Sequence, residues 1–315
     1  MNIKEIIAYG ANKLKQNNIQ DSNIKARVLV QYILQQDKNY LIINSKKEVN
    51  EQDKRIYEQY IQELIQGKPL QYITHTQEFM GLDFYVDENV LIPQPDTERL
   101  VEEAIKCIED RMAYILENNK IKILDMCTGS GAIAISIAKY FQEKYDNINE
   151  VNIRKENNET IQSKNQNIKI EVYGIDISEE ALKIAEKNAR TKGVNVAFLK
   201  SNMFEKIEEY VKEKFDIIVS NPPYIETEVI NTLSNEVRQE PHIALDGGQD
   251  GLDFYKIIAQ HGIKYLKENG SILMEIGYNQ KESVTKLFEE EQQYIDIECM
   301  KDLSGNDRVI CVKKK

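Results

Sequence analysis

The sequence predicts an α/β fold, in which a doubly wound, mostly parallel sheet with an antiparallel C-terminal edge follows a small bundle of helices. From residue 121 onward, short apolar runs of strand length alternate with amphipathic runs of helix length, as in successive βα units. Residues 1–66 instead repeat apolar side chains at intervals of three and four, which indicates helices. The length of 315 residues favours two domains, because single domains usually span about 100–200 residues.

The first 71 residues are expected to form the helical domain, whose last helix ends at Gly67 and Pro69. The bundle shows no cluster of catalytic side chains, so it is either a module that docks a substrate or a structural cap. Residues 72–95 are expected to form a β-hairpin linker. Apolar residues partly alternate there between Phe79 and Ile92, and Gly81 supplies a turn signal.

Residues 96–315 carry the alternation of strands and helices. Pro93 and Pro95 stiffen the start of a helix that is expected over residues 97–116. Strands are expected at residues 122–126, 168–175, 196–199, 215–220 and 271–276, with an antiparallel edge pair near 294–300 and 309–312. Further helices are expected over residues 132–140, 178–191 and 252–266.

Residues 141–167 interrupt this alternation. They are rich in Asn, Gln, Lys and Glu and poor in apolar residues, so we expect a solvated, mobile loop. The loop leads into the strand at 168–175 and therefore lies opposite the carboxyl ends of the strands, where ligands bind. A long insertion at that place should cost little stability.

Composition and charge exclude several classes of protein. The chain has 41 Lys and Arg against 52 Asp and Glu, a net charge of −11, which disfavours nucleic acid as a direct substrate. No apolar run approaches the roughly 18 residues of a membrane span, and the N-terminus lacks the pattern of a secretory signal. We therefore expect a cytoplasmic protein without a membrane partner, and a monomer by default. The four cysteines and three histidines form no CxxC pair or ligand cluster, so neither a metal site nor a disulfide framework is expected.

A glycine-containing turn follows the first strand of the sheet and precedes a helix. It reads Asp125-Met-Cys127-Thr-Gly129-Ser-Gly131, and its small residues would let a ligand approach backbone N–H groups at the helix N-terminus. Asp176 ends the next strand, where an acidic side chain can bind ribose hydroxyls. Without the insertion it would follow at about the usual 20 positions. Together these features predict a nucleoside-bearing cofactor, either a dinucleotide or S-adenosylmethionine.

The tetrapeptide Asn221-Pro222-Pro223-Tyr224 follows the strand at 215–220 and decides between these cofactors. Its prolines fix the backbone and remove N–H donors. The Asn221 side-chain oxygen and the Pro222 carbonyl can accept hydrogen bonds from a planar amide or amino group, with Tyr224 as an aromatic wall. That arrangement would turn the nitrogen lone pair toward a methyl donor, which favours S-adenosylmethionine.

These segments resemble the HemK/PrmC family of protein-(glutamine-N5) methyltransferases, which modify peptide-chain release factors. The resemblance covers most of the chain and includes residues 67–74, 79–84, 90–98, 125–134, 174–176, 221–225, 240–252, 275–277 and 305–309. It implies a Rossmann-like S-adenosylmethionine-dependent methyltransferase domain over residues 96–315. The tetrapeptide alone is shared with DNA adenine methyltransferases.

The resemblance also implies an activity. The enzyme would transfer a methyl group from S-adenosyl-L-methionine to the side-chain amide nitrogen of the glutamine in the Gly-Gly-Gln motif of class 1 peptide-chain release factors. The product of the cofactor would be S-adenosyl-L-homocysteine, no metal would be used, and the N-terminal helices would contact the release factor. The residues implied as catalytic are Asn221, Pro222 and Tyr224, and those holding the glutamine are Asn221, Pro222, Pro223 and Tyr224. The residues implied to contact the cofactor are Cys127, Thr128, Gly129, Ser130, Gly131, Asp176, Asn202, Met203 and Asn221.

Three residues depart from the family pattern. Cys127 stands where the family commonly has glycine. A left-handed backbone there would strain a cysteine by about 1–2 kcal/mol, and we expect instead that a small side chain suffices. Gln94 replaces the usual arginine between two prolines, so the salt bridge of that arginine is absent. Asn202 replaces a common aspartate near the adenine, and its amide oxygen can still accept a hydrogen bond.

No histidine, cysteine or carboxylate stands beside the tetrapeptide in the sequence to act as a general base, so we expect catalysis mainly by positioning. The main alternative is an N6-adenine DNA or RNA methyltransferase that uses the same turn, although the acidic catalytic portion disfavours it. Two weaker alternatives remain. One is a release-factor-like module, because the chain itself contains Gly247-Gly248-Gln249, and the other is a cofactor-binding scaffold without activity.

Overall fold

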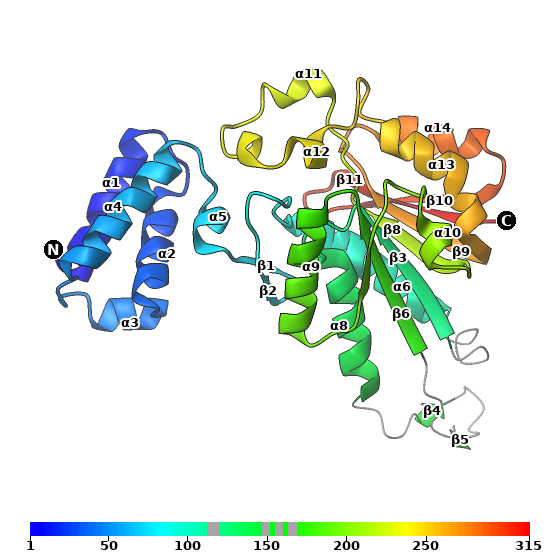
Figure 1. Cartoon of the computed structure of the whole chain (residues 1–315), viewed down its shortest axis with the longest axis horizontal. Coiled ribbons are helices and arrows are strands. Elements are labelled where there is room, and N and C mark those ends of the chain that lie inside the picture. Colours follow the sequence, from blue (N-terminus) through cyan, green and yellow to red (C-terminus); the bar gives the residue numbers. More distant parts are fainter. Residues whose placement is uncertain (112–119, 147–151, 155–159, 163–168) are drawn as a thin grey trace.

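The computed structural model describes residues 1–111, 120–146, 152–154, 160–162 and 169–315. A bundle of helices at the N-terminal end stands beside a larger body, in which helices cover a twisted sheet (Figure 1). The two parts are joined by a short hairpin and an extended segment. The predicted fold class is therefore confirmed.

The N-terminal bundle is built from short helices, several of which begin at a side-chain cap. Its helices are α1 (Ile3–Gln16), α2 (Ser22–Leu34), α3 (Lys38–Ile43), α4 (Glu51–Ile65) and α5 (Leu70–Thr74). Asn2 and Glu5 form a capping box at α1, which satisfies backbone donors that the helix itself cannot. Gly10 allows close packing inside the bundle, since a Cβ there would lie 1.9 Å from the Tyr57 hydroxyl.

A two-stranded hairpin follows the bundle. Strands β1 (Gln77–Phe79) and β2 (Leu82–Phe84) pair antiparallel. Phe79 and Phe84 are both fully buried, in the core between the sheet and the helices on one of its faces. The chain then runs extended to a 3₁₀ turn (Pro95–Thr97), and Val90 and Ile92 pack on the helix that follows β6.

The main sheet has seven strands in the order β10-β11-β9-β8-β3-β6-β7. The pairs from β9 across to β7 are parallel, whereas β11 runs antiparallel to both β9 and β10. The strands are β3 (Lys120–Met126), β6 (Lys169–Asp176), β7 (Ala197–Lys200), β8 (Phe215–Ser220), β9 (Leu266–Glu275), β10 (Tyr294–Lys301) and β11 (Asp307–Lys314). The central strands β3 and β8 are buried almost throughout, because both faces of the sheet are covered there, whereas most residues of the edge strand β10 are exposed or half-buried.

Helices cover the two faces in separate groups. One core forms against α6 (Glu98–Asp110), α8 (Ala132–Asp146) and α9 (Glu179–Lys192). The other forms against α10 (Ile207–Tyr210), α13 (Asp253–Tyr265) and α14 (Lys281–Glu290). Between β8 and α13 the chain makes a long excursion with α11 (Thr227–Ile230), a 3₁₀ turn (Val237–Gln239) and α12 (His242–Leu245), which reaches toward the bundle (Figure 1).

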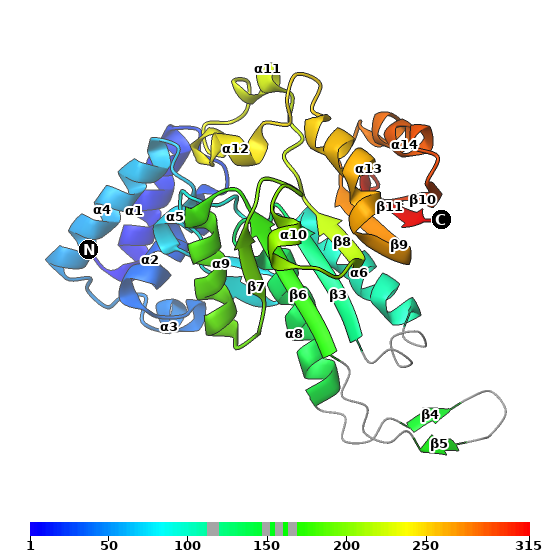
Figure 2. The same cartoon turned by 45° about the vertical axis from the view of Figure 1, so that its right-hand side comes forward.

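The predicted loop at 141–167 falls largely outside the described residues. Its first residues continue α8, which ends at Asp146 and not at the predicted Tyr140. Two short strands, β4 (Asn152–Arg154) and β5 (Thr160–Gln162), pair antiparallel and lie apart from the main sheet, beyond the end where β6 begins (Figure 2). The predicted helix over 97–116 ends at Asp110, and its predicted last turn also lies outside the described residues.

The order of the strands fixes where a ligand can bind. The chain passes from β3 to β6 and β7 on one side, then returns to place β8 on the other side of β3. Met126 and Ser220, the last residues of β3 and β8, are paired across the two strands. The loops that follow β3 and β8 therefore separate at a switch point of the sheet, which is where open α/β sheets bind ligands.

Candidate active site

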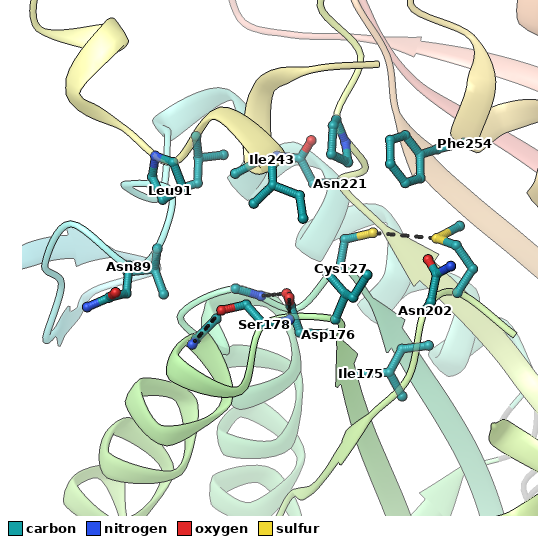
Figure 3. A pocket seen from close by; sticks show the side chains of 18 of the residues that line it. Asn89, Leu91, Cys127, Ile175, Asp176, Ser178, Asn202, Asn221, Ile243 and Phe254 are labelled. Atoms are coloured by element: carbon teal, nitrogen blue, oxygen red, sulfur yellow. Dashed lines mark hydrogen bonds between the residues drawn. The ribbon is translucent and has the colours of Figure 1, made fainter. Parts of the chain in front are cut away.

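A cavity opens at this switch point, with about 760 Å³ of empty space when its open mouth is included. Cys127 and Asp176 lie on one side of it, and Asn221 and Ile243 lie on the other (Figure 3). The lining comes from the extended linker, the loop after β3, the ends of β6 and β7, the turn after β8, α12 and α13. The lining residues are Asn89, Val90, Leu91, Cys127, Gly129, Ile175, Asp176, Ile177, Ser178, Ala181, Ser201, Asn202, Met203, Asn221, Pro223, Pro241, Ile243, Ala244 and Phe254.

The loop after β3 is held by its own side chains. The Thr128 hydroxyl donates to Asp125 Oδ2 at 2.6 Å, and the same oxygen accepts from the Ala134 N–H at 3.1 Å. Gly131 has φ of +80°, and a Cβ there would lie 2.8 Å from the Ile135 Cδ1. Among the predicted cofactor residues of this loop, Cys127 and Gly129 line the cavity. Thr128, Ser130 and Gly131 lie behind them and shape the loop.

Cys127 adopts the left-handed backbone conformation, with φ of +59°. The expectation that a small side chain suffices at this position was therefore wrong, because the backbone itself is of the kind that favours glycine. The Cys127 Sγ lies 3.8 Å from the Sδ of Met203, whose φ is also positive at +47°. Burial and the nearby carboxylates raise the pKa of the Cys127 thiol, so the group stays protonated.

Asp176 ends β6 with its carboxylate at the cavity wall. Its Oδ2 accepts from the Gly129 N–H and its Oδ1 from the Ser178 N–H, each at 2.9 Å. These two bonds connect the loop after β3 to the start of α9 and fix the carboxylate plane. Each oxygen keeps a further lone pair for a hydroxyl donor. Burial raises the pKa of Asp176 despite these bonds.

The far end of the cavity is mostly apolar. Ile175, Ile177, Met203 and Phe254 line it, which suits a flat aromatic ring. Asn202 stands at its edge and donates from Nδ2 to Glu205 Oε1 at 2.8 Å. This bond leaves the Asn202 amide oxygen to accept from an amino group.

Some residues of the turn after β8 line the cavity, and others hold the turn in place. Asn221 and Pro223 line the cavity, whereas Tyr224 turns its hydroxyl toward Glu275 Oε1 at 3.2 Å. Asn221 Nδ2 donates to the Thr97 hydroxyl at 3.1 Å. Among the residues that the structure describes, none donates a hydrogen bond to Asn221 Oδ1 or to the Pro222 carbonyl. Asn221 Oδ1 is therefore available to a ligand in the cavity, whereas Pro222 is buried and does not line it, so the contact through the Pro222 carbonyl stays a prediction.

A carboxyl group does lie beside this turn, which corrects the expectation drawn from the sequence. Glu275, the last residue of β9, is 2 % exposed and accepts from the hydroxyls of Thr97 and Tyr224. Burial raises its pKa to about 7, against the lowering effects of the Thr97 hydrogen bond and the Arg308 charge. Strands β8 and β9 are neighbours in the sheet, which places Glu275 beside the turn that follows β8. In the sequence, the only indication of this role was that Glu275 lies near the end of a predicted strand.

Several other residues of the site were not predicted. Asn89, Val90 and Leu91 come from the linker, and Pro241 and Ile243 from the excursion after β8. They line the cavity from segments without regular strands, so neither periodicity nor a glycine turn marks them in the sequence.

The tripeptide Gly247-Gly248-Gln249 is part of the support of the turn. The Gly247 N–H donates to the Ile225 carbonyl at 2.8 Å, and the Gly248 carbonyl accepts from the Thr227 N–H at 3.0 Å. A Cβ at Gly247 would lie 2.7 Å from the Tyr224 Cα. Gly247 is thus required by close packing against the tetrapeptide, whereas Gly248 has a positive φ of +90° and packs against Asp253.

Comparison with known proteins identifies the family. Two family models match the chain, the PrmC N-terminal domain over residues 5–74 and a methyltransferase domain over residues 117–311. The release factor glutamine methyltransferase of Clostridium acetobutylicum is 38% identical, and the match covers 98% of both chains. The chain belongs to the release factor glutamine methyltransferase family. The resemblance noted in the sequence is thereby confirmed.

A second relative agrees with this assignment, and one solved structure shares the fold. The release factor glutamine methyltransferase of Clostridium botulinum is 36% identical over the whole of both chains. The hMettl16 catalytic domain, solved in complex with a MAT2A 3′UTR hairpin, is 13% identical with a TM-score of 0.51, covering 75% of this chain and 76% of that one, and shows the shared fold. Within the described residues, no helix has the length and apolar character of a membrane span.

Proposed function

We propose that the protein methylates the N5 nitrogen of the glutamine in the Gly-Gly-Gln motif of class 1 peptide-chain release factors, with S-adenosyl-L-methionine as the methyl donor. Its relatives are release factor glutamine methyltransferases, which supports both the reaction and the substrate. The observation in the structure that carries the proposal is Asn221 Oδ1, which belongs to a cavity-lining residue and accepts no hydrogen bond from the described residues. Together with the predicted acceptor at the Pro222 carbonyl, it would match the two N–H groups of a primary amide.

The residues of the cavity fit the proposed cofactor. Asp176 offers carboxylate lone pairs to ribose hydroxyls, and the apolar end beside Phe254 and Met203 suits the adenine ring. A Cβ at Gly129 would meet nothing within 4 Å, so the backbone there is open to a close ligand. Cys127 and Asn202 also line the cavity and complete this set, whereas Thr128, Ser130 and Gly131 shape the loop behind it. S-adenosylmethionine, when bound, supplies a methyl group made electrophilic by its sulfonium sulfur.

The chain contributes mainly position and electrostatics to the reaction. An amide nitrogen is a poor nucleophile because its lone pair is delocalised into the carbonyl. Asn221 and Pro222 would hold both N–H groups in the plane of the turn, so that the face of the nitrogen points into the cavity that also contains Asp176. Holding reacting atoms about 3–3.5 Å apart removes several kcal/mol of barrier, and the two oxygens stabilise positive charge that develops on the nitrogen. The displaced proton then passes to water.

The N-terminal bundle is the proposed contact for the release factor. It stands beside the excursion after β8 that leads directly out of the tetrapeptide (Figure 1). The Lys25 Nζ bonds the Glu236 carboxylate at 2.8 Å across this boundary. A protein loop that reaches the turn would therefore meet both parts of the chain.

The Asn221→Ala variant tests the role of the turn. It should keep cofactor affinity, because most of the cavity is unchanged, and lose most methyl transfer, because one of the two acceptors is gone. Single-turnover transfer to a purified release factor, with mass spectrometry of the modified peptide, measures the second effect. Asn231→Ala, an exposed position on the same excursion, is the matched control.

Two results would contradict the proposal. Near-normal single-turnover methylation by Asn221→Ala would remove the assigned role from the turn. Methyl incorporation into DNA or RNA oligonucleotides, with none into the release factor, would favour the adenine methyltransferase instead.

A further inference from the structure

Glu275 lies buried behind the wall of the cavity that carries Asn221. Its Oε2 accepts from the Thr97 hydroxyl at 2.5 Å and its Oε1 from the Tyr224 hydroxyl at 3.2 Å. Its backbone carbonyl accepts from the hydroxyl of Tyr255 at 2.8 Å. The Glu275 carboxylate thus accepts hydrogen bonds from a residue of the turn before α6 and from a residue of the tetrapeptide. Neither Thr97 nor Glu275 lines the cavity itself.

The direction of these hydrogen bonds determines how Asn221 is turned. An ionised carboxylate only accepts, so the single hydroxyl proton of Thr97 must point to Glu275. The Thr97 oxygen can then only accept from its other neighbour, which is the Asn221 side chain at 3.1 Å. The Asn221 NH₂ group is therefore drawn to Thr97, and its Oδ1 is left facing the ligand.

We propose that Glu275, acting through the Thr97 hydroxyl, is the positioning residue that keeps Asn221 Oδ1, and not the Asn221 NH₂ group, directed at the substrate amide. This inference rests on the proposed function, since it concerns how Asn221 holds the glutamine. An Asn221 turned by 180° would present two donors to the N–H donors of the substrate. The turned side chain would repel the amide that it should bind.

The charge state of Glu275 controls this direction. A protonated Glu275 can donate to Thr97, which frees the Thr97 proton to donate to Asn221 and favours the turned amide. The groups that face Glu275 are the hydroxyls of Thr97 and Tyr224 and the charges of Arg308 and Asp96. Arg308 is itself held by Asp96 at 3.0 Å and Asp302 at 3.1 Å. With the pKa of Glu275 near 7, the transfer rate should fall as the pH drops below about 7.

The first test compares two substitutions at Thr97. Thr97→Val keeps the shape and removes the hydroxyl, and it should lower the single-turnover rate at high pH by about tenfold or more. Thr97→Ser restores the hydroxyl and should recover most of the rate together with its acid limb. Affinity for S-adenosylmethionine should change little in either variant. Thr191→Val, at an exposed site on α9, is the control. A Thr97→Val enzyme with the wild-type rate and pH profile would overturn the inference.

The second test uses Glu275→Gln, which has no titrating group. Over one unit on either side of about pH 7, its rate should lose the acid limb that the wild type shows. This outcome holds whichever way the new amide is turned, so it does not depend on how much activity remains. An unchanged acid limb in Glu275→Gln would assign the titration to another group and overturn the inference.

A readout without substrate separates this inference from the proposed function. The ¹⁵N–¹H signals of the Asn221 side chain, assigned by their loss in Asn221→Ala, should shift with pH near 7 in the wild type and not in Thr97→Val. If the wild-type enzyme does not methylate release factors, the proposed function is wrong. If the pH dependence of the Asn221 signals is the same in Thr97→Val as in the wild type, the role of Glu275 and Thr97 in orienting Asn221 is wrong.

Discussion

At the scale of single residues, the site contains backbone strain at two facing positions. Cys127 and Met203 both have positive φ, +59° and +47°, and their sulfur atoms meet at 3.8 Å. For a residue with a Cβ, this conformation costs about 1–2 kcal/mol. Such strain persists only where the surrounding structure holds it. Here Cys127 follows β3 directly, and its neighbour Thr128 is fixed by bonds to Asp125 and to the Ile175 carbonyl.

At position 127, a glycine variant should therefore be more stable than an alanine variant, which is the reverse of the usual order. Cys127→Gly and Cys127→Ala both remove the sulfur, but only glycine relieves the left-handed backbone. The glycine variant should be the more stable of the two by about 1 kcal/mol, although alanine is usually the better choice. Urea denaturation monitored by circular dichroism measures the difference. An alanine variant equal to or above the glycine variant would show that position 127 is not strained.

Asp176 and Asn221 could be identified from the sequence as site residues, whereas the roles of the residues that support Asn221 could not. Asp176 and Asn221 follow apolar strands in a βα pattern, and the structure places both in one cavity. Thr97 and Glu275 act through hydrogen bonds between segments far apart in the chain. Their roles depend on which strands are neighbours and on side-chain direction, and neither is written in a local pattern.

At the scale of elements, α9 ties the linker to the loop after β3. The side chain of Asn188 is 2 % exposed and satisfies three backbone groups at once. It accepts from the Tyr85 N–H at 2.8 Å and donates to the carbonyls of Tyr85 at 3.0 Å and Ser130 at 2.9 Å. The Asn188 side chain therefore holds both the linker and the predicted cofactor loop in place.

Removing this side chain should affect stability and the cofactor together. Asn188→Ala leaves one buried and two partly buried backbone groups without this partner, which should destabilise the fold by about 2–4 kcal/mol. The loop with Ser130 also loses its support, so affinity for S-adenosylmethionine should fall. Thermal unfolding and calorimetric titration measure the two effects, and Glu186→Ala on the exposed face of α9 is the control. A normal affinity in a destabilised variant would show that the tie serves the linker alone.

Element positions were predictable where periodicity is strong and less so elsewhere. The strands and the helices on the sheet follow their apolar patterns, whereas α8 continues to Asp146, past the point where the polar run begins. A helix can extend with polar residues once its first turns are packed, which a pattern search does not detect. The domain boundaries at residues 71 and 95 stay a prediction.

At the scale of the whole molecule, buried carboxyl groups link stability to pH. Burial raises the pKa of Asp125, Glu240 and Glu275 to about 7 in each case. Asp125 Oδ1 is buried without a hydrogen-bond partner among the described residues, and this further destabilises the charged form of Asp125. Between the ordinary carboxyl pKa and about 7, the folded chain holds protons that the unfolded chain has released.

The protein should therefore become less stable as the pH rises through 7. The stabilisation by these raised pKa values is complete at acid pH, below the unfolded values. It is lost between those values and about 7, by up to about 1.4 kcal/mol per group for each pH unit. Thermal melting at a series of pH values checks the sign. Glu240→Gln can still accept from the Ile92 N–H and should flatten the dependence. Melting temperatures that increase toward alkaline pH would refute the assignment of these groups.

The excursion after β8 begins at the tetrapeptide and returns to it, because Ile225 pairs with Asp246 and a Cβ at Gly247 has no room beside Tyr224. Its middle is bound to the bundle through Lys25 and Glu236. The two ends of the excursion thus pack against the tetrapeptide, and its middle contacts the N-terminal helices. We therefore expect a partner that displaces the N-terminal helices to displace this segment as well, and with it Ile243 at the rim of the cavity.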